Sequence, residues 1–291
     1  MSRIEMAMEK AAQLRQTGGE AAPTPAEALQ PERPFSAATE DRHELRAPVS
    51  PQYGKLEPDN PFLVNLYDPH SPAAEEYRKL KSVLVKMTTG ETFRNALMVT
   101  SALPNEGKSL TAVNLALSLA QELDHTVLLV DADLRRPSVH HYLNVEQGVG
   151  FSEVLSGEVG LGEAIIPTGM GKLSIIRSGR TIDNPSELFT AQRTRAIIQE
   201  LKTRYPDRYI IFDTPPVLPF AESRSLAHLV DGVLFVIMER LASQVNIREA
   251  LDSLKGCPVL GTIYNAAAVD RADGRYSYYR DYSRGKQAVA P

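Results

Sequence analysis

The sequence predicts an α/β fold with a mostly parallel sheet and helices on both faces. Two observations carry this prediction: short apolar runs alternate with longer helical stretches, and the runs are apolar at nearly every position instead of at every second one. Strands buried on both faces have that composition, and parallel strands need helical crossovers between them. The expected strands are residues 96–100, 127–130, 173–176, 209–212, 233–237 and 259–263.

The composition is that of a globular protein without an obvious nucleic-acid partner. Of 291 residues, 43% are hydrophobic, which is enough to bury a core. Lys and Arg total 32 against 36 Asp and Glu, so the net charge of -4 does not favour nucleic acid. Cys257 is the single cysteine, without the neighbours that a metal site needs. Since no apolar run approaches the ~20 residues that span a bilayer, we expect a cytoplasmic protein that meets the membrane through a partner.

Composition divides the chain into four segments. The first sixteen residues place apolar side chains at helical spacing, which predicts a short amphipathic helix that either docks on a partner or frays. The next stretch holds eight of the 20 prolines and few aliphatic residues, which predicts disorder. Ser71-Pro72 predicts the start of a helix. The expected segments are a helix (1–16), a Pro-rich linker (17–65), a folded domain (66–270) and a flexible tyrosine-rich tail (271–291).

The strongest local motif is Gly107-Lys108-Ser109 between an apolar strand and an apolar helix. This is the context of a Walker A phosphate loop, in which backbone N–H groups cradle phosphates, Lys108 reaches the β- and γ-phosphates and Ser109 ligates Mg²⁺. The alternative is an ordinary loop. Ala102 stands where the motif has its first glycine, so that bend must form without the freedom of glycine. The candidate nucleotide contacts are Pro104, Asn105, Glu106, Gly107, Lys108, Ser109 and Leu110.

Three aspartates follow two of the expected strands. Asp131 ends one strand, Asp133 lies two residues further on, and Asp213 ends another strand. Ligands bind at the carboxyl ends of parallel strands, where these acids would meet Lys108. Asp131 and Asp133 suit a hydrated Mg²⁺ or a proton acceptor, although an acid-rich turn is the alternative. Asp213 has the position of a Walker B aspartate. Together with the phosphate loop, these acids predict a phosphoryl-transfer site on a P-loop NTPase-type fold.

With these motifs the chain resembles the bacterial tyrosine kinases of exopolysaccharide and capsule biosynthesis. Residues 128–135 (LLVDADLR) match the Walker A' pattern of that family, and residues 210–216 (IIFDTPP) match its Walker B pattern. The likeness continues through residues 148–158, 178–189 and 261–265, so that it covers roughly residues 70 to 290. The resemblance implies ATP and Mg²⁺ as cofactors. It implies that Lys108, Asp131 and Asp133 are catalytic, that Ser109, Asp133 and Asp213 hold the metal, and that Asn265 contacts adenine.

A predicted helix carries residues at the positions by which that family joins subunits into a ring. Glu75, Arg78 and Lys81 match its E-x-x-R-x-x-R pattern, and spacing of three places them on one helix surface. Lys81 stands where the family has arginine, and lysine lacks the bidentate pairing of arginine. The alternative is a solvated helix face. The resemblance thus implies a homo-oligomer.

The C-terminal tail holds a cluster of tyrosines in a polar stretch. Burial in a core does not explain tyrosines at such a place. The resemblance implies that they are autophosphorylated in trans by a neighbouring subunit, whereas an aromatic peptide that packs on a partner is the alternative. The expected phosphate acceptors are Tyr276, Tyr278, Tyr279 and Tyr282.

The first fifteen residues resemble the tyrosine autokinases of exosortase-linked exopolysaccharide loci, which lack their own membrane spans. The resemblance implies an inner-membrane chain-length determinant (a polysaccharide co-polymerase) as activator, a tyrosine phosphatase as a further partner, and control of polymer synthesis and export. Two other functions remain. A ParA/MinD-type ATPase shares the motifs but carries an extra lysine where this chain has Ala102-Leu103-Pro104. A nucleotide-dependent switch that phosphorylates nothing is the second.

Overall fold

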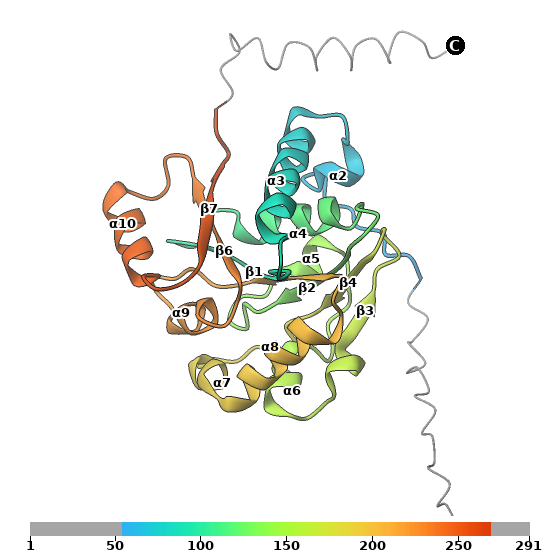
Figure 1. The fold of residues 1–291 in the computed structure, drawn as a ribbon, viewed down its shortest axis with the longest axis vertical. Coiled ribbons are helices and arrows are strands. Elements are labelled where there is room, and N and C mark those ends of the chain that lie inside the picture. The colour runs from blue at the N-terminus through green and yellow to red at the C-terminus, as the bar shows by residue number, and fades with distance from the viewer. Residues whose placement is uncertain (1–53, 269–291) are drawn as a thin grey trace, which may run out of the picture. The chain divides into compact units, whose positions relative to one another are not determined.

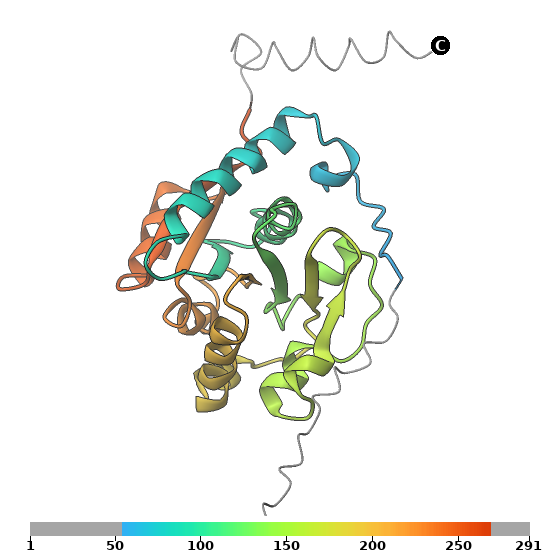
Figure 2. The same cartoon turned by 45° about the vertical axis from the view of Figure 1, so that its right-hand side comes forward.

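The computed structural model describes residues 54–268, which form a mixed α/β fold around one sheet (Figure 1). The predicted fold class is confirmed: the sheet has seven strands, and helices cover both of its faces (Figure 2). The amphipathic helix expected over 1–16, the linker up to residue 53 and the tail from residue 271 lie outside the described residues.

The strands follow the order β3-β4-β2-β5-β1-β6-β7, which places β1 in the interior. Every neighbouring pair is parallel except β3 and β4, which are antiparallel. Each of the six expected strands lies within an observed one; β3 was not expected, because three residues ending in a proline carry no readable pattern. The strands are β1 (Ala96–Ser101), β2 (Thr126–Asp131), β3 (Ile165–Pro167), β4 (Leu173–Ile176), β5 (Arg208–Asp213), β6 (Gly232–Met238) and β7 (Val259–Asn265).

Two apolar clusters hold the helices against the sheet, because side chains alternate along each strand. In β1, Leu97 and Val99 join one cluster, whereas Ala96 and Met98 join the other. The first cluster packs against α2 (Val64–Tyr67), α3 (Pro72–Thr88), α4 (Lys108–Leu119) and α5 (Val139–Tyr142). The second packs against α6 (Phe151–Ser156), α7 (Ser186–Thr190), α8 (Gln192–Arg204), α9 (Ala221–Ala227) and α10 (Gln244–Ser253), with a 3₁₀ turn at Leu161–Ala164.

Helix α3 begins where the sequence predicts it to begin. Pro72 is its first residue, and the Ser71 hydroxyl accepts a hydrogen bond from the Ala74 N–H at 3.1 Å. Serine at this position satisfies an N–H group that has no partner within the helix. No helix within residues 54–268 combines the length and the apolar character that crossing a bilayer requires.

Residues 54–65 pack on the folded part, although the expected linker extends to residue 65. Leu63 is fully buried in the cluster around α4. The Asn65 amide donates to the Asn114 carbonyl at 3.0 Å, and the Asn114 amide donates to the Phe62 carbonyl at the same distance. Composition gives only the amount of apolar surface in a segment. It cannot show that residues 54–65 pack on a surface of α4, which orders them.

Candidate nucleotide and phosphoryl-transfer site

The parallel register brings the strand-end aspartates together. Asp131 of β2 lies directly opposite Asp213 of β5, and Val99 of the neighbouring strand β1 lies opposite Asp213 on the other side. Lys108 begins α4 immediately after the loop that follows β1. Since parallel strands end at the same edge of the sheet, this edge gathers the phosphate loop and the acidic side chains.

The phosphate loop is shaped by two residues in the left-handed region. Asn105 has φ 67° and Gly107 has φ 82°, whereas Ala102 is not among the described residues with positive φ. The missing first glycine therefore costs the loop no strain. A Cβ atom at residue 107 would also lie 2.1 Å from Nδ2 of Asn265, so a larger residue there would displace the amide that donates to the Glu106 carbonyl.

Glu106 braces the loop from inside. Its side chain is fully buried, accepts the Leu103 N–H through Oε2 at 2.7 Å and accepts the Met238 N–H through Oε1 at 3.3 Å. Its own carbonyl accepts a hydrogen bond from Asn265 Nδ2 at 2.9 Å. The side chain thus ties the loop to β6 and does not face the cavity. Sequence reasoning grouped it with the nucleotide contacts and missed this role, because a buried unpaired glutamate is rare.

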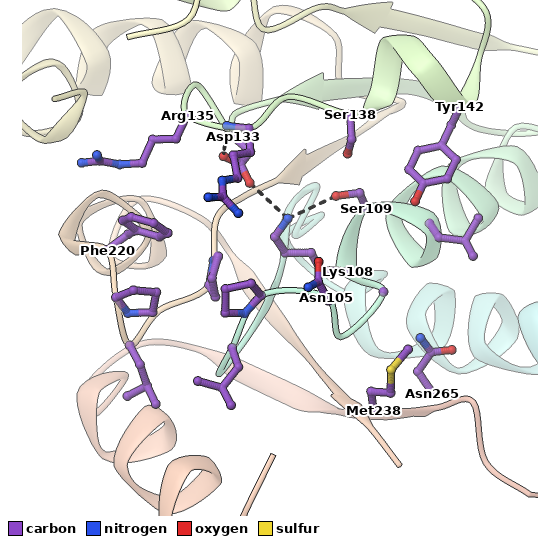
Figure 3. Close-up of a pocket in the computed structure, with 18 of the residues that line it drawn as sticks. Asn105, Lys108, Ser109, Asp133, Arg135, Ser138, Tyr142, Phe220, Met238 and Asn265 are labelled. Carbon is purple, nitrogen blue, oxygen red and sulfur yellow. Dashed lines mark hydrogen bonds and ion pairs between the residues drawn. The ribbon is translucent and has the colours of Figure 1, made fainter. Parts of the chain in front are cut away.

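Lys108 lies between an acid and a hydroxyl, as Figure 3 shows. Its Nζ atom is 3.1 Å from Oδ2 of Asp133 and donates to Oγ of Ser109 at 3.2 Å. Burial lowers the pKa of Lys108, but the charges of Asp213 and Asp133 outweigh burial and raise the pKa overall. Lys108 is therefore a partly buried cation at the N-terminus of helix α4.

Asp131 is fully buried and bonded to the backbone. Its Oδ2 accepts the N–H groups of Ser138 and Val139, each at 3.1 Å, and its Oδ1 accepts that of Asp133 at 3.2 Å. Burial, followed by the charge of Asp213, raises the pKa of Asp131 well above its usual value against these donors. Asp131 holds the start of α5 in place.

Asp213 is a buried carboxylate without a hydrogen-bond partner. Neither of its oxygens is bonded to any of residues 54–268. Burial raises its pKa to about 6, although the Lys108 charge and the nearby Ser109 hydroxyl act in the opposite direction. A buried acid left unsatisfied costs free energy unless a cation or water joins it. The lack of hydrogen-bond partners at both oxygens of Asp213 fits a magnesium ion close to Ser109 and Asp133.

The number of candidate protein ligands in this site also suits magnesium. Among residues 54–268, no three His, Cys, Asp or Glu side chains stand together as ligands of one ion. Mg²⁺ in phosphoryl-transfer sites is held by one or two carboxylates, with phosphates and waters completing its shell. Ser109, Asp133 and Asp213 supply such a partial set.

A cavity of about 890 Å³ opens beside these groups. Its size falls within the range of small-molecule and cofactor sites. Pro104, Asn105, Gly107, Lys108, Ser109, Leu110, Asp133 and Asn265 line it, whereas Glu106, Asp131 and Asp213 are not part of its wall. Figure 3 shows Asn265 beside Met238, away from Asp133. Residues that sequence reasoning did not single out also line it: Phe62, Leu103, Arg135, Arg136, Ser138, Tyr142, Pro216, Leu218, Pro219, Phe220, Met238 and Glu249.

Arg135 lines this cavity and ties it to helix α9. Its Nε donates to Oε1 of the buried Glu222 at 2.5 Å, and its guanidinium lies 4.7 Å from the ring centre of Phe220. Charge pairing and stacking on an aromatic face both favour arginine over lysine here. The arginine that ends the Walker A' match over residues 128–135 was the available signal in the sequence.

The candidate ring residues are engaged within their own chain. Arg78 Nε donates to Oε2 of Glu75 at 2.7 Å, and Arg78 Nη1 donates to the Pro69 carbonyl at 2.8 Å. Lys81 instead pairs with Glu122, just beyond α4, at 2.6 Å. The four candidate acceptor tyrosines, Tyr276, Tyr278, Tyr279 and Tyr282, lie outside the described residues.

A strand, a phosphate loop with its lysine, and carboxylates at two strand ends define the class of P-loop nucleotide enzymes. Comparison with known proteins narrows this class. The AAA domain family matches residues 105–253. The tyrosine-protein kinase YwqD of Bacillus subtilis is 32% identical over 219 residues, which cover 75% of this chain and 90% of that protein. The chain belongs to the bacterial tyrosine-protein kinase family, a family of enzymes, and the resemblance read from its motifs is confirmed.

Further relatives agree. The tyrosine-protein kinase etk of Escherichia coli (strain K12) is 33% identical over 220 residues, which cover 75% of this chain and 30% of that longer protein. The solved kinase domain of E. coli ETK has a TM-score of 0.66 at 29% identity, covering 79% of this chain and 89% of that one. The septum site-determining protein MinD of Pyrococcus horikoshii, solved with Mg-ADP, has a TM-score of 0.50 at 23% identity, covering 58% and 69%. That last likeness concerns the fold alone.

Proposed function

We propose that this protein is an ATP-dependent tyrosine autokinase that phosphorylates its own C-terminal cluster in trans. One observation carries the proposal: Lys108 pairs with Asp133 in the wall of a nucleotide-sized cavity and lies near enough to the buried, unsatisfied Asp213 for their charges to interact, in a chain of the tyrosine-kinase family. Mg·ATP, when bound, supplies the phosphoryl group and the charge that spreads over it during transfer.

The residues of the site divide the work of holding the nucleotide. Lys108 and the backbone N–H groups of residues 105–110 neutralise the phosphates. Ser109, Asp133 and Asp213 hold the magnesium ion, partly through water. Asn265 lies at the end of the cavity away from Asp133, where an adenine ring has the apolar side of Met238 to pack on.

Asp131 is our candidate for the group that receives the tyrosine proton. A free phenol has a pKa near ~10, so a local base is needed at neutral pH. The raised pKa of Asp131 brings it closer to the operating pH than an ordinary aspartate. Because Ser138 and Val139 donate to its Oδ2 in this state, transfer follows release of that oxygen from the two amides.

The assembly, the partners and the cellular process that we propose rest on the family resemblance. A ring formed through Glu75, Arg78 and Lys81 would present each tail to a neighbouring active site. A polysaccharide co-polymerase of the inner membrane would recruit and activate this cytoplasmic enzyme, and a tyrosine phosphatase would reverse its action. Cycles of phosphorylation would then control exopolysaccharide polymerisation and export.

The test is phosphotyrosine formation by purified full-length protein given Mg·ATP, followed by mass spectrometry and antibody. Lys108→Met should abolish the signal, because it removes the cation aimed at the phosphates while leaving the packing largely intact. Lys255→Met, at an exposed lysine paired with Asp252, is the matched control and should leave the signal unchanged. ATP hydrolysis without phosphotyrosine would favour the ParA/MinD-type ATPase, and nucleotide binding without either reaction would favour the switch.

A further inference from the structure

A second cavity lies apart from the nucleotide site. It has a volume of about 70 Å³ and shares no lining residue with the larger cavity. Two segments that are distant in sequence, residues 137–148 and 177–181, form its wall, and the side chains of His140 and Arg177 are more than nine-tenths buried. The lining residues are Pro137, His140, Gln147, Gly148, Arg177, Ser178, Gly179, Arg180 and Thr181.

Arg177 brings a positive charge to this cavity without an acid to balance it. Only 8% of the residue is exposed, and its guanidinium donates to the carbonyls of Glu146 and, at 3.2 Å, Val149. Its Nε has no partner within residues 54–268, and none of the ion pairs in that part of the chain includes it. A buried cation in such surroundings is costly unless an anion accompanies it.

His140 adds a second unsatisfied nitrogen. The residue is 6% exposed, and its Nε2 has no hydrogen-bond partner in the described part of the chain. Burial, His141 and Arg177 together lower its pKa, because nothing negative offsets them. The nearby acids are committed elsewhere: Glu153 accepts the N–H groups of Gly150 and Arg180, and Glu158 pairs with the Arg180 side chain.

We propose that this cavity binds a small oxyanion of the phosphate class, presented either as free phosphate or as the phosphoryl group of a phosphotyrosine. Its volume corresponds to roughly two water molecules at ~30 Å³ each, which leaves room for one tetrahedral group. Arg177 Nε and His140 Nε2 are the donors that the anion would satisfy. Arginine binds phosphate oxygens with short, charge-assisted hydrogen bonds.

The second cavity lies next to the segment that holds Asp131; an effect on proton transfer rests on the proposed function, whereas the binding of an anion does not. Pro137 and His140 in its wall flank Ser138 and Val139, whose N–H groups hold Asp131. An oxyanion bound here fixes the same segment that must release Asp131 in the proposed proton transfer. Binding to the folded state alone would also raise the melting temperature.

The test uses the full-length protein saturated with Mg·ADP, so that the phosphate loop is occupied. Inorganic phosphate and phenyl phosphate are titrated separately while the amide NMR signals of Gly148 and Gly179 and the heat of binding are followed. We expect saturable binding that moves both signals. Tighter binding of phenyl phosphate identifies a phosphotyrosine side chain as the source of the anion, whereas equal or weaker binding identifies free phosphate.

Variants assign the binding to this cavity. Arg177→Gln should weaken it by about tenfold or more, because a charge-assisted contact is lost. His140→Phe keeps a ring beside His141 but removes Nε2, and should weaken binding several-fold. Arg193→Gln is the matched control. Like Arg177, which donates to the Val149 carbonyl and lies against Gly148, Arg193 donates to a backbone carbonyl and lies against a glycine, Gly157, but it lines neither cavity.

The proposal is overturned if neither anion binds, if neither variant in the cavity weakens binding, or if Arg193→Gln weakens it equally. Circular dichroism establishes that each variant is folded. Arg177 also holds the loop that carries Glu146 and Val149, so Arg177→Gln is the variant at risk of misfolding. In that event the comparison of His140→Phe with Arg193→Gln decides the question.

Discussion

In the metal-free protein, the buried Asp213 carboxyl lowers the free energy of unfolding by an amount that depends on pH. Its pKa is about 6 in the fold against 3.8 for the free side chain, so the folded state favours the protonated form. The contribution of Asp213 to the free energy of unfolding is complete below pH ~4 and is lost as the pH rises through ~6. The loss is on the order of 3 kcal/mol. Asp213→Asn should therefore stabilise the metal-free protein increasingly between pH 4 and pH 7, while removing activity with Mg·ATP.

Thermal unfolding in chelating buffer at a series of pH values measures this effect. The difference in melting temperature between Asp213→Asn and the parent should grow with pH and then level off above pH ~6. A difference that is constant with pH, or that favours the parent at neutral pH, would show that Asp213 is paired in the folded protein. Magnesium and ADP should reduce the advantage of the variant, because a cation favours the charged carboxylate.

Asp131 and Asp133 should respond differently to the loss of a charge. Asp131→Asn should lower the rate of autophosphorylation by ~10²–10⁴-fold if the carboxylate receives the proton, with the affinity for Mg·ATP little changed. Asp133→Asn should mainly weaken the binding of Mg·ATP, because Asp133 pairs with Lys108 and lines the cavity. Rates and nucleotide affinities of both variants separate these effects. If Asp131→Asn lowers only the melting temperature, Asp131 holds α5 and takes no proton.

Glu106 offers a test of how the loop is held. Glu106→Gln replaces one acceptor oxygen by an NH₂ group, which must face the N–H of either Leu103 or Met238. Leaving such a buried donor unsatisfied costs about 1–3 kcal/mol. We expect a lower free energy of unfolding and weaker nucleotide binding, measured by denaturant titration and calorimetry. Glu158→Gln, at the surface, is the control, and an equal effect of both changes would contradict the bracing role.

At the scale of elements, helix α3 carries the prediction about assembly. Arg78→Ala removes the central cation of the face formed by Glu75, Arg78 and Lys81, and should shift a ring-forming species toward monomer. Lys79→Ala removes a cation from the same helix outside that pattern and should not. Light scattering on a demonstrated oligomer measures both. An unchanged molar mass in Arg78→Ala would remove α3 from the interface.

Patterns that repeat along the chain made most elements predictable. The apolar strands and the cap at Ser71 follow from local sequence alone, and the convergence of Asp131 and Asp213 follows once two parallel strands are assumed. Short elements without a repeat were missed, as β3 was, because three residues give no period. Residues 54–65 were assigned to the linker because their order depends on a surface of α4 far along the chain.

Side chains whose role depends on distant partners were missed for the same reason. Glu106 is an ordinary charged residue in the sequence, and only the fold reveals the Met238 N–H that it accepts. Arg177 follows β4 and His140 belongs to α5, thirty-seven positions earlier in the chain, and only the fold brings the two residues to one cavity. Motifs therefore identified the phosphate-loop cavity and its lysine, but not the groups that support that loop or the second cavity.

At the scale of the whole molecule, charge in the C-terminal tail should govern how long subunits stay together. Residues 271–286 carry five basic and two acidic side chains, a balance of +3. Each phosphotyrosine adds ~-1.5 to -2 charges at neutral pH, so four of them would reverse that sign. We expect the unmodified tail to be attracted to the acids of a neighbouring site and the phosphorylated tail to be repelled by them.

The central claim, transfer to these tyrosines between subunits, is tested most directly by mixing two complementary variants. One carries Lys108→Met and keeps its tail; the other keeps Lys108 and has Tyr276, Tyr278, Tyr279 and Tyr282 replaced by Phe. Each alone should form little phosphotyrosine with Mg·ATP. Mixed together, they should place phosphate on the tail of the Lys108→Met chain, as peptide mass spectrometry would show. An unmodified tail in the mixture, or phosphate chiefly at other residues, would contradict the account.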